Sequence, residues 1–184
     1  MESPANGIFL VADPFLKDPN FMRSVVLICK HNNDEGTFGF TLTRQLEQTL
    51  DEFIPGLEEF PFKVYLGGPV QVDTIHYLHQ YPDLLPGSYE ILDGIYWGGD
   101  FDMLRQFIKS GEIKEDKIKF FLGYSGWEAG QLQTELQENS WLTVMGNRKV
   151  VFDTPLDEIW KSSIRLLGGK YEMMINFPID PQLN

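Results

Sequence analysis

The first 43 residues contain three short apolar segments separated by turn-forming residues, and this succession constrains the fold more than any other feature of the chain. Residues 7–12 read GIFLVA and stop at an Asp-Pro pair, while residues 24–30 and 37–43 flank the turn-rich hexapeptide HNNDEG. Short runs rich in β-branched and aromatic residues, bounded by Gly, Asn, Asp and Pro, are typical of strands. Because no helical pattern intervenes, we expect the second and third segments to form an antiparallel hairpin.

Helix and strand patterns mix without regular alternation in the remaining chain. Apolar spacing and capping residues predict helices at 45–53, 101–109, 128–137 and 154–167, the last capped by Thr154. Strands are expected at 63–66, 73–79, 88–97 (broken at an Asp-Gly pair) and 117–124, with a second hairpin formed by 141–145 and 149–152, and an irregular tail from 171. This order favours an α+β fold with a mixed sheet over a doubly wound one. With 184 residues and no linker, the chain is expected to be a single domain, residues 1–184.

The stretch FFLGYSGWEAGQLQTEL, residues 120–136, has the strand-turn-helix order of a nucleophile elbow. The elbow needs small residues on both sides of the nucleophile, but its second glycine position is Trp127. All three histidines also precede Ser125, against the usual Ser-acid-His order. We therefore expect no catalytic residue here; the glycines allow a tight turn, and Trp127 packs beneath it.

Metal and phosphate chemistry find little support in the sequence. His76 and His79 lie in a strand-like segment, where residues three apart point to opposite faces and cannot share an ion. Gly67-Gly68-Pro69 follows a strand, but the proline lacks an N–H donor and no Lys-Ser/Thr pair follows. Late basic residues offer the one candidate anion-facing patch, and such charges are more often solvated: Arg148, Lys149, Lys161, Arg165 and Lys170. No metal or cofactor is expected.

A net charge of −12 argues against nonspecific nucleic-acid binding and against anionic membranes. No run of about 18 apolar residues is present to span a membrane. The start of the chain lacks the pattern of a signal peptide. Its one cysteine, Cys29, lies in an apolar run and is expected to be a buried small hydrophobe. A cytoplasmic location is therefore expected.

The expected helix at 128–137 carries a polar stripe beside an apolar one. Glu128, Gln131 and Glu135 share one face at spacings of three and four. Ala129, Leu132 and Leu136 form the adjacent apolar stripe. Such a border either lines a groove or is an ordinary solvated surface.

Four stretches of the chain resemble the bacterial AlgH/YqgE family, a group without settled biochemical function. They are GIFLVADPFLKDPNFMRSVVLICKHNNDEGTFGFTL (7–42), VYLGGPVQVDTIHYLH (64–79), FLGYSGWEAGQLQTELQENSW (121–141) and IWKSSIRLLGG (159–169). They occur in family order over nearly the whole chain. Members often have Ala in place of Ser125, and usually read Leu-Asn-Arg-Pro where this chain has Leu-Thr-Arg-Gln at 42–45.

The resemblance implies an α+β fold in which helices surround a mixed, barrel-like sheet. Some members are described as transcriptional regulators, although the sequence contains no DNA-contacting motif. We expect a cytosolic, non-enzymatic binding or regulatory protein acting on a protein partner or small ligand; the alternative is an enzyme or small-ligand site built from His, Arg and Glu. Convergence of these groups in one pocket would favour catalysis, and the oligomeric state stays open. The family pattern and the helix face give these candidate binding residues: Arg23, His31, Gly67, Gly68, His79, Trp127, Gln131 and Glu135.

Overall fold

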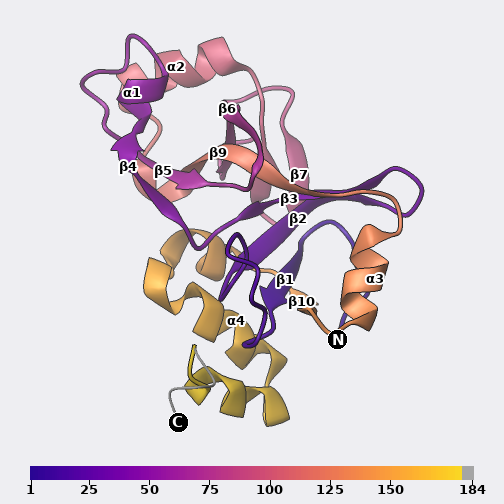
Figure 1. Cartoon of the computed structure of the whole chain (residues 1–184). Coiled ribbons are helices and arrows are strands. Elements are labelled where there is room, and N and C mark those ends of the chain that lie inside the picture. The colour runs from indigo at the N-terminus through magenta and orange to yellow at the C-terminus, as the bar shows by residue number, and fades with distance from the viewer. Residues whose placement is uncertain (180–184) are drawn as a thin grey trace.

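A strongly curled, largely antiparallel sheet of ten strands forms the centre of the chain, seen in a computed structural model that describes residues 1–179 (Figure 1). Its main path has the order β10-β1-β2-β3-β9-β6-β8-β7; off this path, β5 pairs with β9 and β4 pairs with β5. The β5–β9 pair is parallel, which makes the sheet mixed. The strands are β1 (Ile8–Ala12), β2 (Val25–Asn32), β3 (Gly36–Thr41), β4 (Gln45–Thr49), β5 (Lys63–Leu66), β6 (Val70–His79), β7 (Tyr89–Leu92), β8 (Ile95–Trp97), β9 (Ile118–Trp127) and β10 (Trp141–Met145).

The first strands are continuously apolar because helices cover both of their faces. Phe9 and Val11 of β1 pack in a cluster with Trp160 and other residues of α4 (Ile159–Leu167). Ile8 and Leu10 point the other way, into a cluster with Leu132 of α3 (Gln131–Gln137). Successive strand residues point to opposite faces, so a strand buried on both faces lacks the polar alternation of a half-exposed one.

A second core fills the end of the molecule that carries α1 (Leu50–Phe53) and α2 (Phe101–Lys109), opposite α4 in Figure 1. Leu104 and Ile108 of α2 are buried there with Phe120 of β9. The carboxylate of Asp100 accepts a 2.9 Å hydrogen bond from the Met103 N–H and caps α2. This helix, strand β5, the β2–β3 hairpin and the break between β7 and β8 are confirmed predictions. Cys29 is buried, as predicted.

Strand β9 joins the parts of the sheet, because it pairs with β3, β5 and β6. The predicted turn at Gly-Tyr-Ser-Gly is wrong: β9 runs through it to Trp127, held by pairing with β3. Gly123 has φ +67°, and a Cβ there would lie 2.7 Å from the Val70 carbonyl oxygen. Glycine is therefore needed for a kinked strand and a close approach of β6, and does not form an elbow.

Other local predictions were corrected by tertiary pairing. The helix predicted for 45–53 begins only at Leu50, because residues 45–49 pair with β5. The strand predicted for 149–152 is a π-helical segment, Lys149–Asp153, and the hydroxyl of Thr154 donates to the Lys149 carbonyl instead of capping α4. The helix predicted from 128 begins at Gln131, after Gly130 at φ +80°. The tail predicted to be irregular contains a 3-10 helix, Gly169–Asn176.

Candidate functional site

An open groove of about 800 Å³ lies where β3, β9, β6 and β8 meet the start of α3. That volume falls within the range typical of small-ligand sites. Its lining combines aromatic rings with a charged rim. The lining residues are Lys30, Glu35, Gly36, Thr37, Phe38, Val70, His76, Trp97, Tyr124, Gly126, Trp127, Glu128 and Gln131.

Four partly buried rings from four different strands form the aromatic part of the groove, and each contacts its neighbours. Phe38 packs edge-on against Trp97 and Tyr124, with ring centroids 5.0 and 5.9 Å apart. His76 completes the set, 6.4 Å from Trp97 and 6.1 Å from Tyr124. The four contacts close a quadrilateral, and all four residues line the groove. We call Phe38, His76, Trp97 and Tyr124 the aromatic quartet.

The imidazole of His76 is half-buried in the wall of the groove. Burial lowers the pKa of its imidazole below the ordinary 6.5, so the ring is neutral near pH 7. Its Nε2 is shielded from solvent and has no hydrogen-bond partner within residues 1–179. The ring of Phe40 lies beneath it at 5.2 Å. The groove therefore contains a neutral, partly unsatisfied imidazole among aromatic faces.

The rim of the groove carries more acidic than basic side chains. Lys30 and Glu35 are exposed and lie 3.8 Å apart, Nζ to Oε2. Glu128 is also exposed at the rim, and its backbone N–H donates to Oε1 of Gln131 at 3.0 Å. Two carboxylates against one ammonium leave this opening with a net negative charge near pH 7.

Two of the residues predicted from sequence, Trp127 and Gln131, line the groove, and Glu135 supports them from behind. The carboxylate of Glu135 accepts hydrogen bonds from the indole N–H groups of Trp127 (2.8 Å) and Trp141 (2.7 Å). The Gln131 amide donates to its other oxygen at 2.9 Å. His31 lies one contact away, with Nδ1 2.6 Å from the hydroxyl of Thr37 in the groove wall.

Arg23 lies elsewhere, at the junction of the β1–β2 connection with the C-terminal segment. Its guanidinium donates a 2.6 Å hydrogen bond to the Phe177 carbonyl and stacks 4.3 Å above the Trp160 ring. Burial lowers the pKa of this guanidinium, an effect that nearby Asp13 opposes. These contacts join the C-terminal segment at Phe177 to Trp160 of α4 through Arg23. Arg23 is not among the residues that line the groove.

Gly67, Gly68 and His79 are buried at strand contacts. A Cβ at Gly68 would collide with the backbone of Tyr124 and Ser125, so close backbone packing explains this glycine. Nε2 of His79 lies 2.7 Å from the Gly98 carbonyl, and Nδ1 accepts from the Tyr81 N–H at 3.0 Å. Both ring nitrogens of His79 are thus satisfied in the neutral form, and burial lowers its pKa.

Ser125 cannot be reached from the groove, because it is fully buried. Its hydroxyl donates to the Gly67 carbonyl at 2.9 Å and lies 3.0 Å from the Thr41 hydroxyl. This geometry supports the rejection of Ser125 as a nucleophile.

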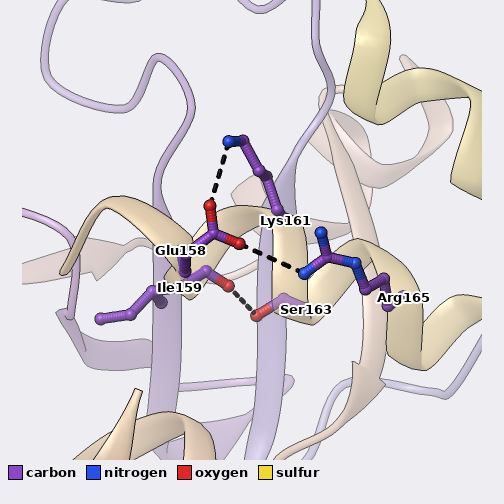
Figure 2. Close-up of polar contacts among 5 residues, drawn as sticks. All are labelled: Glu158, Ile159, Lys161, Ser163 and Arg165. Carbon is purple, nitrogen blue, oxygen red and sulfur yellow. Dashed lines mark hydrogen bonds and ion pairs between the residues drawn. The ribbon is translucent and has the colours of Figure 1, made fainter. Parts of the chain in front are cut away.

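The basic patch noted in the sequence is partly neutralised on α4. Figure 2 shows Glu158 between Lys161 and Arg165, at 3.1 and 3.3 Å. These two partners lower the pKa of the Glu158 carboxyl. The arrangement leaves fewer free cations for an anion on this helix.

Sequence reasoning missed the aromatic quartet because its members come from segments far apart in the chain. His76 was considered only together with His79. The available signal was the period-two alternation of side chains along strands β6 and β9. It assigns His76 to one face of β6 and puts Tyr124 and Gly126 on the same face of β9. The pairing of β3 with β9 then brings Phe38 opposite Gly126.

Comparison with known proteins places this fold and site in context. A family model described as AlgH-like matches residues 9–172. A UPF0301 protein of Chlorobium limicola is 44% identical over 178 residues, covering 97% of this chain and 95% of that protein. A UPF0301 protein of Cytophaga hutchinsonii is 40% identical over 179 residues, covering 97% and 98%.

Two solved structures have the same fold. The solution structure of the AlgH protein from Pseudomonas aeruginosa is 30% identical, with a TM-score of 0.74, and covers 97% of this chain and 98% of that one. A Corynebacterium diphtheriae protein solved by X-ray crystallography has a TM-score of 0.78 at 22% identity, covering 96% and 94%. The single-domain α+β fold with a barrel-like sheet, which the family resemblance implied, is therefore confirmed.

Proposed function

This chain belongs to the AlgH-like family, and from that premise we propose that it is a cytoplasmic binding protein whose ligand or protein partner occupies the aromatic groove. One observation carries the proposal: four strands present Phe38, His76, Trp97 and Tyr124 to a single open groove of ligand size. Aromatic side chains with a few polar groups at the edge are typical of binding sites. A regulatory role would then act through occupancy of this groove.

The scattering of the predicted polar groups supports binding over catalysis. Catalysis by a His, an Arg and a carboxylate requires them within hydrogen-bond reach of one reacting group. Here Arg23 bonds to the Phe177 carbonyl and His79 to the Gly98 carbonyl, while Glu135 holds two indoles. Each group has its own structural partner, and these partners belong to separate regions of the fold.

Direct regulation of DNA has little physical support. The net charge of −12 repels phosphates, and a protein of this charge needs a local basic surface to bind a duplex. On α4 two of the candidate cations already contact Glu158. In residues 1–179, no helix has the length and apolar character needed to cross a membrane.

A thermal-shift screen with a library of small molecules tests the proposal, because a ligand that binds only the folded state raises Tm. The wild-type chain and Tyr124→Leu are screened side by side. We expect ligands that stabilise the wild type and lose their effect in the variant. Hits that stabilise both proteins equally would place the binding site outside the groove and contradict the proposal.

A further inference from the structure

We propose that the groove recognises a quaternary ammonium group, which packs against the aromatic quartet and which the acidic rim attracts; this inference rests on the proposed function. The ligand class is a small organic cation with a methylated nitrogen. Three independent features of the groove support it: ring geometry, charge and the scarcity of free hydrogen-bond acceptors on its aromatic side.

The ring geometry suits a cation. Aromatic faces attract a cation within about 6 Å of the ring centroid, and several rings around one point add their attraction. The quartet closes on itself through contacts of 5.0 to 6.4 Å, so a group seated at its opening touches more than one ring.

Among the described residues, cations lie over aromatic rings outside the quartet and none lies over the quartet itself. Within residues 1–179, cation–π contacts are made by Arg23 on Trp160, Lys119 on Tyr65 and Lys170 on Tyr171. Lys30 lines the groove, yet its ammonium pairs with Glu35 at 3.8 Å. Within the described residues, no cation of the chain therefore competes with an external cation for the quartet.

Charge complementarity favours the same ligand class. Glu35 and Glu128 oppose the single Lys30 at the rim, and the whole chain carries −12. The Glu128 carboxylate has no ion pair or hydrogen bond within the described part of the chain. His76 adds no opposing charge near pH 7, because burial lowers its pKa. A phosphate or carboxylate ligand would meet repulsion at this opening.

Hydrogen-bonding capacity separates a quaternary ammonium from other cations. A primary ammonium brings three N–H donors and a guanidinium five, and burying them without acceptors is costly. Around the quartet the groove is lined by aromatic rings and Val70. The side-chain acceptors there are the Tyr124 hydroxyl and one nitrogen of the neutral His76 ring, too few for the donors of either cation. A quaternary nitrogen carries no N–H to satisfy, so burying it against aromatic rings leaves no donor unpaired.

Choline chloride and 3,3-dimethylbutan-1-ol test the inference as a matched pair, because the alcohol has nearly the same shape without the charge. Each is titrated into the full chain at fixed ionic strength and followed by the indole N–H resonance of Trp97. We expect choline to bind at least tenfold more tightly than the alcohol. Guanidinium and ammonium chloride at the same concentrations are expected to bind at least tenfold more weakly than choline.

Two variants, each with a matched control, show whether choline binds at the quartet and its acidic rim. Tyr124→Leu removes one ring and is expected to weaken choline binding at least tenfold, whereas Phe101→Leu, an exposed aromatic on α2, leaves it unchanged. Glu128→Gln lies at the exposed rim, where folding is not at risk, and is expected to weaken choline about threefold while leaving the alcohol unaffected. Glu138→Gln, exposed at the end of α3, is its control.

The outcomes distinguish this inference from the proposed function. Equal affinity for choline and the alcohol, or no choline binding, overturns the cation inference. If choline fails but library ligands raise the Tm of the wild type and not that of Tyr124→Leu, the groove is still a binding site, for a different class of ligand. Choline binding that survives both Tyr124→Leu and Glu128→Gln overturns the inference by placing the cation elsewhere.

Discussion

The indole N–H of Trp127 donates a 2.8 Å hydrogen bond to Oε2 of Glu135, which joins the last residue of β9 to the middle of α3. The same oxygen accepts from Trp141 at 2.7 Å, so one carboxylate satisfies two buried indoles from two strands. The rings of Trp127 and Trp141 meet edge-on at 5.9 Å. This contact fixes α3 against the sheet and sets the wall of the groove.

Replacing Glu135 by Ala should destabilise the fold by about 2–4 kcal/mol, because two buried donors lose their acceptor. Glu135→Gln keeps an acceptor oxygen and is expected to cost less. The control is Glu138→Ala, an exposed residue just beyond the same helix. Denaturant unfolding measures the difference, and a Glu135→Ala cost equal to that of the control would show that the two indole bonds contribute nothing.

Trp127→Ala should cost about 3–5 kcal/mol, since truncating a buried Trp leaves a cavity. The side chain is only 5% exposed and packs with Leu132 and the ring of Phe21, 6.0 Å away. Urea unfolding of the variant gives the value. A loss under about 1 kcal/mol would reject the anchoring role and make ligand stacking the better explanation of Trp127.

Ser125→Ala should preserve both the fold and any groove binding. The lost hydroxyl leaves the Gly67 carbonyl its bond from the Thr41 N–H (2.8 Å), so we expect a cost of about 0.5–1.5 kcal/mol. Ligand affinity and stability are measured on the same preparation. A hundredfold loss of affinity or activity at normal stability would restore a chemical role for Ser125.

Lys119 is a buried cation whose replacement should stabilise the protein. Burial lowers the pKa of its ammonium to about 8 from 10.5, helped by Lys63 and opposed by Asp153. Between these pKa values the unfolded chain binds more protons, so the free energy of unfolding of the wild type rises with pH over that window. Below pH 8 the buried charge is a constant penalty, and Lys119→Met should gain about 1–3 kcal/mol at pH 7.

The gain from Lys119→Met should shrink as the pH rises from 8 toward 10.5, because Lys119 is then neutral in the folded state and progressively loses its proton in the unfolded state as well. Lys117→Met, at an exposed position, serves as the control. Urea unfolding at pH 7, 8, 9 and 10 follows the difference between variant and wild type. A gain that grows with pH, or a net loss at pH 7 beyond that of the control, would contradict the assigned pKa.

Local sequence signals predicted the parts of the fold that depend on neighbouring residues. The β2–β3 hairpin follows from the turn residues around Asn32, and α2 from the helical spacing of Leu104, Phe107 and Ile108. The helix predicted for residues 45–49 was wrong because their pairing with β5 overrides the helical spacing of Leu46, Leu50 and Phe53. Tertiary context decides such ambiguous segments, and one sequence does not contain it.

The site was harder to predict than the fold because it depends on strand register. Phe38 and Tyr124 are far apart in the chain and meet only because Phe38 pairs opposite Gly126. Gly126 is exposed, and its missing side chain leaves the groove open beside Tyr124. Trp127 and Gln131 were found because they lie within one recognisable motif, whereas the quartet has no motif in sequence.

Chemical-shift mapping of the most stabilising library ligand on the uniformly ¹⁵N-labelled chain tests the central claim most directly. The account predicts the largest shifts at the Trp97 indole N–H and at the backbone amides of Gly36, Phe38, Gly126 and Gln131, all lining the groove. Largest shifts around Arg23 and Phe177, or around Gly67 and His79, with the Trp97 indole unmoved, would contradict it.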